Sequence, residues 1–424
     1  MSADRRVVYM NARLLDPASE LDAIGALLTV GDKIWDFGPD LFADGVTDGS
    51  EIVECEGCCL APGLVDMQVF LGESVDATSN AAAAGGVTTL AVMPNMSPPL
   101  DQVALVDYIE RLARDAAVRI HPIAAATKGL AGQEMTEIGL LKDAGALAFT
   151  DGRSAVADAQ VMRRLLTYAD AHGAMVIQHA EDPSLAQGGV MNEGEMATRM
   201  GLPGIPPEAE IIMIERDLRL VAMTGARYHV ALVTTAEGVE AIRKAKAAGL
   251  PVTCGTAPHY FALNELATAE YRTFAKVSPP LRSEDDRRAV VEGLADGTID
   301  VIVSSHDPHD VESKRLPFDL AEPGMVGLET MLPMMLELDH GGHIPLIHIL
   351  KAATSKPADV LGIPGGKLEK GAPADLVLFD PDAPFRIDPE NFHSKAKNSA
   401  FDGRPAQGRV LRTVVGGETA FKAD

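Results

Sequence analysis

The sequence is poor in aromatic residues, in positive charge and in long apolar runs, and each shortage excludes a class of function. Only 4% of the 424 residues are aromatic and one is a tryptophan, so aromatic stacking platforms and carbohydrate clefts are not expected. With 37 Lys and Arg against 61 Asp and Glu, the formal net charge is -24, and so acidic a chain should repel nucleic acid and anionic membranes. No apolar run approaches the roughly 20 residues of a membrane-spanning helix. We therefore expect neither a nucleic-acid nor a membrane partner.

Cysteines are also few, and their spacing fits neither a disulfide framework nor two zinc-binding halves. Cys55, Cys58 and Cys59 lie together, whereas Cys254 is distant. Small buried side chains are the simpler interpretation of the cluster than a metal site. Residues 1–6 lead directly into a strand-like run and do not resemble a signal peptide. The expectation is a reduced, cytoplasmic protein.

What the sequence does have is a long alternation of short apolar runs and helical patterns. Eight strand–helix units in about 300 residues favour a (β/α)8 barrel over an open doubly wound sheet. No Gly-x-Gly-x-x-Gly follows a strand, so a dinucleotide-binding fold gains no support. The expected strands are residues 64–70, 88–93, 118–126, 146–150, 174–180, 227–233, 252–258 and 300–306. The expected helices are residues 101–116, 134–144, 159–172, 208–224, 237–248 and 284–295.

Both ends of the chain have a different texture, with short strands separated by turns. The two ends can pair into one small sheet beside the barrel. We therefore predict a composite β domain made of residues 1–60 and 362–424, and a barrel made of residues 61–361. A helix over residues 354–361 would close the barrel.

A barrel places its chemistry where the strands end on their carboxyl side. Polar residues do gather at these positions, and histidines and carboxylates among them are typical of a metal-dependent hydrolase. They are Asp66, Gln68, Asn95, Asp151, His179, His229, His259 and Ser304–His306.

An ordered set of motifs makes the comparison specific. The chain resembles the dihydroorotases of the amidohydrolase superfamily over almost its whole length. The matching segments are residues 61–73, 84–89, 93–95, 149–153, 179–183, 279–282, 306–309, 327–330 and 374–380. The resemblance implies reversible closure of carbamoyl-aspartate to dihydroorotate, a step of pyrimidine biosynthesis, with one or two zinc ions that polarise an amide carbonyl and hold a hydroxide.

The same resemblance implies a ligand set, and most of that set is missing. Where the family has His-x-His on the first strand, this chain has Gln68 and Phe70, and Gly72 stands where an arginine grips the substrate. The second histidine of the sixth strand is replaced by Leu232, and the aspartate that carries the proton on the eighth strand by Ser305. A phenylalanine or a leucine cannot bind zinc, and a glutamine amide is a poor substitute for imidazole.

Two ligand positions remain, Asp151 for the bridging carboxylate and His179 on the fifth strand. Two protein ligands do not hold a catalytic zinc, which needs three and a water. A remnant of the substrate pocket is expected at Asn95 and His306. Each of these residues also has a plainer interpretation: Asp151 as a turn residue, His179 as an interior histidine, and Asn95 as a loop anchor.

The favoured hypothesis is a catalytically impaired or inactive dihydroorotase homologue that acts as an assembly partner. By resemblance to non-catalytic family members, its partner would be the catalytic chain of aspartate transcarbamoylase, and a homo-oligomer is expected. No cofactor is then expected. The alternative is an active dihydroorotase, or another cyclic-amide hydrolase, with a rebuilt zinc site, for example one using His306, Asp307 and His309. A third option is a regulator that binds a pyrimidine intermediate through the remnant pocket at Asn95.

Overall fold

The structure is a computed structural model, and it describes residues 5–43, 45–46 and 49–423. The expectation that no signal peptide is present rests mainly on residues 1–4, which lie outside the described residues. None of the helices described is both long and apolar enough to cross a lipid bilayer.

Parallel strands form the central barrel, as the sequence predicts. The strand order is β6–β7–β8 in one sheet and β9–β10–β11–β14–β15–β16 in the other, and β8 continues through Ile123 into β9. The barrel closes where Val69 forms a parallel bridge with His306, and the Phe70 N–H donates to the His306 carbonyl at 2.9 Å. The strands are β6 (Leu64–Val69), β7 (Val87–Val92), β8 (Arg119–Pro122), β9 (Ala124–Ala125), β10 (Phe149–Thr150), β11 (Val176–Gln178), β14 (Tyr228–Val230), β15 (Val252–Thr256) and β16 (Val301–Ile302).

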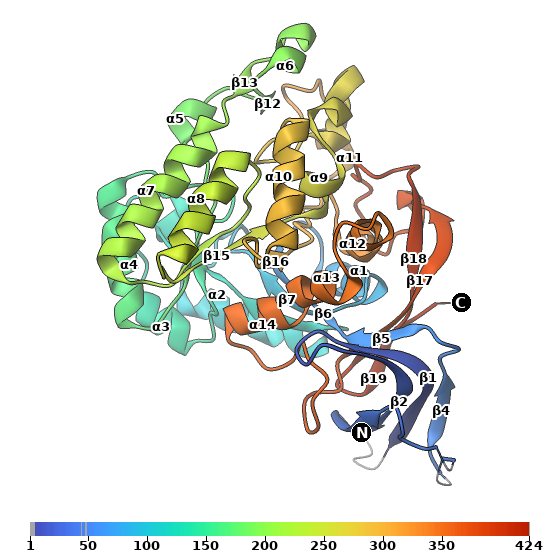
Figure 1. The fold of residues 1–424 in the computed structure, drawn as a ribbon. Coiled ribbons are helices and arrows are strands. Elements are labelled where there is room, and N and C mark those ends of the chain that lie inside the picture. Colours follow the sequence, from blue (N-terminus) through green and yellow to red (C-terminus); the bar gives the residue numbers. More distant parts are fainter. Residues whose placement is uncertain (1–4, 44, 47–48, 424) are drawn as a thin grey trace.

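Helices cover the outside of the barrel (Figure 1). The sequence places two of them within the observed bounds, α7 and α10, because each has a clear local signal at one end. The Ser283 hydroxyl caps α10 by accepting from the Asp286 N–H, and Gly225 ends α7 in a left-handed conformation with φ 74°. The outer helices are α1 (Val75–Ala84), α2 (Val103–Leu112), α3 (Ile138–Asp143), α4 (Ala159–Ala171), α7 (Glu208–Thr224), α8 (Ala236–Ala247), α10 (Glu284–Ala295), α12 (Met331–His340), α13 (Leu346–Ala353) and α14 (Ser355–Leu361).

The two ends of the chain pair into a separate eight-stranded sheet. β5 joins the ends, because it pairs with β1 on one side and with β17 on the other. The bidentate bond from Arg119 to Asp375 ties this sheet to the barrel. The domain boundaries at residues 60/61 and 361/362 stay predictions. The strands are β1 (Arg6–Asp16), β2 (Leu21–Val30), β3 (Lys33–Gly38), β4 (Glu51–Glu54), β5 (Cys59–Pro62), β17 (Leu376–Arg386), β18 (Pro405–Val415) and β19 (Glu418–Lys422).

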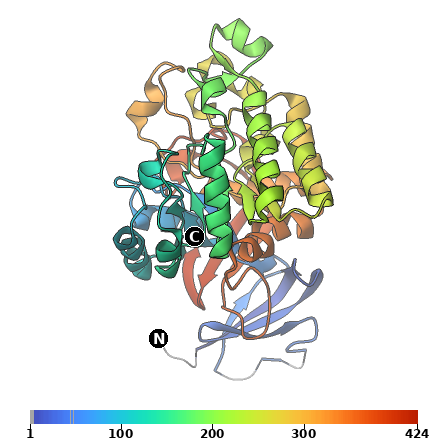
Figure 2. The same ribbon diagram turned by 90° about the vertical axis from the view of Figure 1, so that its left-hand side faces the viewer.

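Short elements that the sequence did not reveal project from the barrel. In both views α6 lies at the opposite end of the molecule from β1 and β2 (Figures 1 and 2). These elements are two to six residues long, too short for a helical or strand period to be read. They are α5 (Pro183–Ala186), β12 (Met191–Asn192), α6 (Glu195–Met200), β13 (Gly204–Ile205), α9 (Pro258–Ala262) and α11 (Val311–Arg315).

Candidate functional site

A cavity of about 110 Å³ lies at the carboxyl ends of the barrel strands. Its position agrees with the general location of active sites in such barrels. The lining comes from the first, fourth, fifth, seventh and eighth barrel strands and from the loops that follow them. The lining residues are Gln68, Phe70, Gly152, Arg153, His179, His259, Val277, Ser278, Ser305, Asp307 and Pro323–Met325.

Two of the replaced ligand positions contact each other inside this cavity. The Gln68 Nε2 donates to the Ser305 Oγ at 3.5 Å, and both residues are buried. The Gln68 N–H donates to the Asp66 carboxylate at 3.1 Å, and the Ser304 N–H donates to the same oxygen at 3.2 Å. The first and eighth strands are therefore joined by a neutral hydrogen bond and by a shared carboxylate at the positions where the resemblance implies metal ligands.

Phe70, the other first-strand replacement, packs against an ion pair. The Arg153 guanidinium carbon lies 4.0 Å from the centre of the Phe70 ring. The Arg153 Nε donates to an Asp307 oxygen at 3.0 Å, and its Nη2 donates to the other oxygen. Burial alone would raise the pKa of Asp307, but His309, whose Nε2 lies 3.4 Å from an Asp307 oxygen, and the hydrogen bonds from Arg153 outweigh it and hold this pKa below its usual value. This pair could not be recognised from the sequence, since its members are 154 residues apart.

The two remaining ligand positions do not face one another. The Asp151 carboxylate accepts from the N–H and the hydroxyl of Thr127 and does not line the cavity. Burial raises its pKa, although the Thr127 bonds oppose the rise. His179 does line the cavity, with its Nε2 at 3.3 Å from the Ser278 Oγ and 3.8 Å from a Glu181 oxygen.

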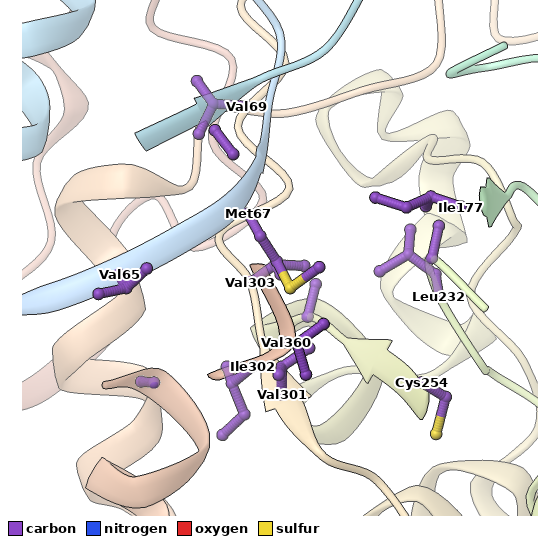
Figure 3. Close-up of a cluster of buried hydrophobic side chains, with 14 of the residues drawn as sticks. Val65, Met67, Val69, Ile177, Leu232, Cys254, Val301, Ile302, Val303 and Val360 are labelled. Atoms are coloured by element: carbon purple, nitrogen blue, oxygen red, sulfur yellow. The ribbon is translucent and has the colours of Figure 1, made fainter. Parts of the chain in front are cut away.

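Leu232 lies in the apolar interior of the barrel. Only 1% of the residue is exposed, and it belongs to the same buried cluster as Ile177, Met67 and Cys254 (Figure 3). His229 lies three residues earlier, in β14, and its Nδ1 shares a hydrogen bond of 2.7 Å with the Thr253 Oγ1. Burial lowers the pKa of His229 to about 3, so it is a neutral interior histidine.

The structure does not bring Asn95 or His306 to the cavity. Asn95 donates to the Asp151 carbonyl at 3.4 Å and packs so closely on Gly152 that a Cβ there would lie 1.5 Å from its Oδ1. His306 is fully buried, accepts at Nδ1 from the Gly327 N–H at 3.3 Å, and has Nε2 at 3.7 Å from a Glu73 oxygen. Both residues hold loops, because local partners turn their side chains away from the cavity.

The donor set does not fit a zinc ion. His179, His259 and Asp307 share the cavity, but Asp307 is engaged by Arg153. Across the part of the chain that the structure describes, no three His, Cys, Asp or Glu side chains are grouped closely enough to hold a metal. This includes the cluster of His306, Asp307 and His309 considered from the sequence. The residues present therefore lack the three convergent ligands of a catalytic zinc site.

Two buried lysines hold the loop that covers the cavity. The Lys276 Nζ donates to the carbonyls of Phe318 and Asp319, and the Lys314 Nζ donates to those of Glu322 and Gly324. Burial lowers the pKa of Lys314 to about 8. Because Pro323–Met325 line the cavity, these ammonium groups fix its cover in place.

Comparison with known proteins identifies close relatives of the chain. A dihydroorotase-like family model matches residues 57–238, and an amidohydrolase family model matches residues 334–421. A protein of Anaplasma phagocytophilum named dihydroorotase is 46% identical over 99% of this chain and 96% of its own length. One of Ehrlichia chaffeensis with the same name is 43% identical over 100% and 96%. These names support the family and give no support to a resemblance with its non-catalytic members.

Solved structures confirm the barrel with a separate small β domain. The L-hydantoinase of Arthrobacter aurescens superposes with a TM-score of 0.88 at 27% identity, over 99% of this chain and 96% of that protein. The dihydropyrimidinase of Brevibacillus agri superposes with a TM-score of 0.84 at 22% identity, over 98% and 94%. The second likeness concerns the fold alone.

Proposed function

Because this chain belongs to the dihydroorotase family of amidohydrolases, we propose that it is a member of pyrimidine biosynthesis that has lost zinc-dependent hydrolysis of cyclic amides. The observation that carries the proposal is the Arg153–Asp307 pair stacked on Phe70, which places a cation of the chain itself at the edge of the cavity and engages the carboxylate there. The fold does not by itself imply an activity, and the side chains of the site argue against the inherited one.

Replacements at several catalytic positions support the proposed loss of hydrolysis. The family's reaction needs a metal to polarise the carbonyl, a carboxylate to carry the proton and an arginine to grip the substrate carboxylate. Here the corresponding positions hold Gln68, Phe70, Leu232, Ser305 and Gly72. Loss of one such group typically slows catalysis roughly 10²–10⁴-fold, and several of these groups are missing together.

The second candidate is an active cyclic-amide hydrolase with a rebuilt metal site. The names of the relatives favour it, since proteins 41–46% identical to this chain are named dihydroorotase. His179, His259 and Asp307 would be its nearest available ligands, because they already line one cavity. Asp307 would first have to leave Arg153.

Zinc content and turnover separate the two candidates. We expect protein produced with added zinc to retain far less than one zinc per chain and to show no measurable dihydroorotase turnover. The double variant Gln68→His with Phe70→His should remain inactive, because Leu232 and Ser305 still supply neither a ligand nor a base. Elemental analysis and an assay in both directions of the reaction measure these outcomes.

A matched variant makes the zinc result decisive. One zinc per chain that disappears on His179→Ala, but not on substitution of the interior His229, would establish the second candidate. Substantial turnover by the double variant would also contradict the proposal, since it would mean that the first-strand ligands alone had been limiting.

The role as an assembly partner stays a prediction based on resemblance. We expect this chain, as a homo-oligomer, to form a complex with the catalytic chain of aspartate transcarbamoylase. Light scattering of the mixed proteins at micromolar concentration should give one species heavier than either component. Two independent peaks would argue strongly against this partner and leave the chemistry of the barrel unaffected.

A further inference from the structure

We propose that the cavity at the barrel mouth binds a small neutral amide, of the size of urea or acetamide. The inference rests on the proposed function, because a cavity holding zinc would offer different chemistry. Three properties of the cavity lead to this class of ligand: its volume, its balance of charge and the hydrogen-bonding groups that line it.

The volume limits the ligand to a few atoms. The cavity measures about 110 Å³. An engineered cavity of about 150 Å³ in another protein accepts benzene, so this one should accept roughly four or five non-hydrogen atoms. Carbamoyl-aspartate and dihydroorotate each have more than twice that number of atoms. The cavity therefore suits neither of the two compounds that the family interconverts.

The charge balance favours a neutral ligand. The charged side chains that line the cavity, Arg153 and Asp307, are bonded to each other. Burial lowers the pKa of His259 to about 3, so its imidazole is neutral near pH 7. The half-buried Glu181 carboxylate, 3.8 Å from the Nε2 of His179, would repel an anion. A charged ligand would lose its water without gaining an unshared counter-ion.

The polar lining matches the two halves of an amide group. Gln68, His179 and His259 are 6%, 6% and 2% exposed, and all three line the cavity. The Gln68 amide and the hydroxyls of Ser278 and Ser305 each offer both a donor and an acceptor, and the neutral His259 imidazole offers one of each. An amide ligand presents a carbonyl acceptor and N–H donors, so both kinds of group would be satisfied.

Acetamide is a suitable probe, because its methyl protons can be followed by saturation-transfer NMR with the full chain in the presence of a chelator. The upper limit of affinity per ligand atom allows a four-atom ligand a Kd of about 40 µM or weaker, so titration should extend into the millimolar range. Acetate is the matched control, with the same size and shape but a negative charge. We expect acetate to bind at least tenfold more weakly. Benzamide, which is too large for the cavity, should not compete.

Variants of the lining test where acetamide binds. Gln68→Leu should weaken binding at least tenfold, whereas Gln160→Leu, on the exposed surface of α4, should not change it. Ser305→Ala provides a second lining variant should Gln68→Leu fail to fold, and near-UV circular dichroism checks folding. The inference is overturned if acetate binds as tightly as acetamide or more tightly, or if acetamide gives no saturation transfer up to roughly 10 mM. Unchanged binding in both lining variants would overturn it as well.

The failure of this inference can be told apart from failure of the proposed function. Elemental analysis of the same sample reports zinc. A zinc-free, inactive protein that does not bind acetamide overturns only the ligand class, whereas one zinc per chain overturns the proposed function itself.

Discussion

Replacing Arg153 with alanine is expected to lower the free energy of unfolding by about 2 kcal/mol at pH 7. Asp307 would remain a carboxylate that is 6% exposed, without the guanidinium that balances its charge. Removing one partner of a fully buried ion pair typically costs about 3–5 kcal/mol. The Arg153 side chain is 38% exposed, so water screens part of the interaction and the smaller value applies.

The loss in Arg153→Ala should depend on pH. In the native protein the pKa of Asp307 lies below its usual value, so its pair contributes stability above the unfolded pKa of about 3.9 and loses it as the pH falls through the folded pKa. In the variant, only His309 opposes the effect of burial, so the pKa of Asp307 rises from its native value and the carboxylate protonates at a higher pH. The difference between variant and native protein should therefore shrink between pH 7 and pH 4.

Urea unfolding at several pH values measures this effect. Two controls isolate the ion pair from the loss of side-chain bulk. Adding Asp307→Asn to the variant should recover part of the lost stability, and millimolar guanidinium ion should raise the melting temperature of Arg153→Ala but not of the native chain. A deficit that is the same at pH 7 and pH 4, with no effect of Asp307→Asn, would show that Arg153 acts through packing alone.

The sequence predicts the long elements of the fold well and the short ones poorly. α7 carries an apolar face over most of its 17 residues and ends at Gly225, and α10 begins at the Ser283 cap, so these bounds follow from the sequence. The segments from α5 to β13 are two to six residues long and too short to show a period. Their conformations depend on neighbours that are distant in the chain.

The candidate site divides in a similar way. The order of strands places Gln68, Phe70, His179 and Ser305 around one cavity, which the sequence could anticipate from their positions at strand ends. It could not anticipate which way a side chain turns. Asp151 follows its strand directly, yet the donors of Thr127 hold its carboxylate away from the cavity. Spacing along the chain specifies a position, and local partners decide the orientation.

The largest loss of stability is expected for Glu210, which lies behind the cavity at the start of α7. Glu210 is completely buried and accepts from the N–H groups of Thr234 and Thr235 at 2.9 and 3.0 Å and from both of their hydroxyls. The Arg282 Nη2 lies 3.8 Å from it and has no other hydrogen-bond partner. Replacement by alanine would leave these donors unsatisfied and the buried Arg282 guanidinium without a counter-charge, at a cost of about 4 kcal/mol.

The loss should extend to the barrel mouth, because the Thr235 hydroxyl that Glu210 orients also caps α8 by accepting from the Gly238 N–H. Glu208→Ala is the matched control, since Glu208 is exposed in the same first turn of α7, and it should change stability by less than about 0.5 kcal/mol. Combining Glu210→Ala with Arg282→Met removes the unpaired guanidinium and should restore part of the lost stability.

If Glu210→Ala unfolds in urea at the same midpoint as Glu208→Ala, the carboxylate does not stabilise this side of the barrel. If instead the double variant is less stable than Glu210→Ala, then the bonds from Arg282 to Asn192 and Thr234, and not its pairing with Glu210, are what stabilise the loops behind the cavity.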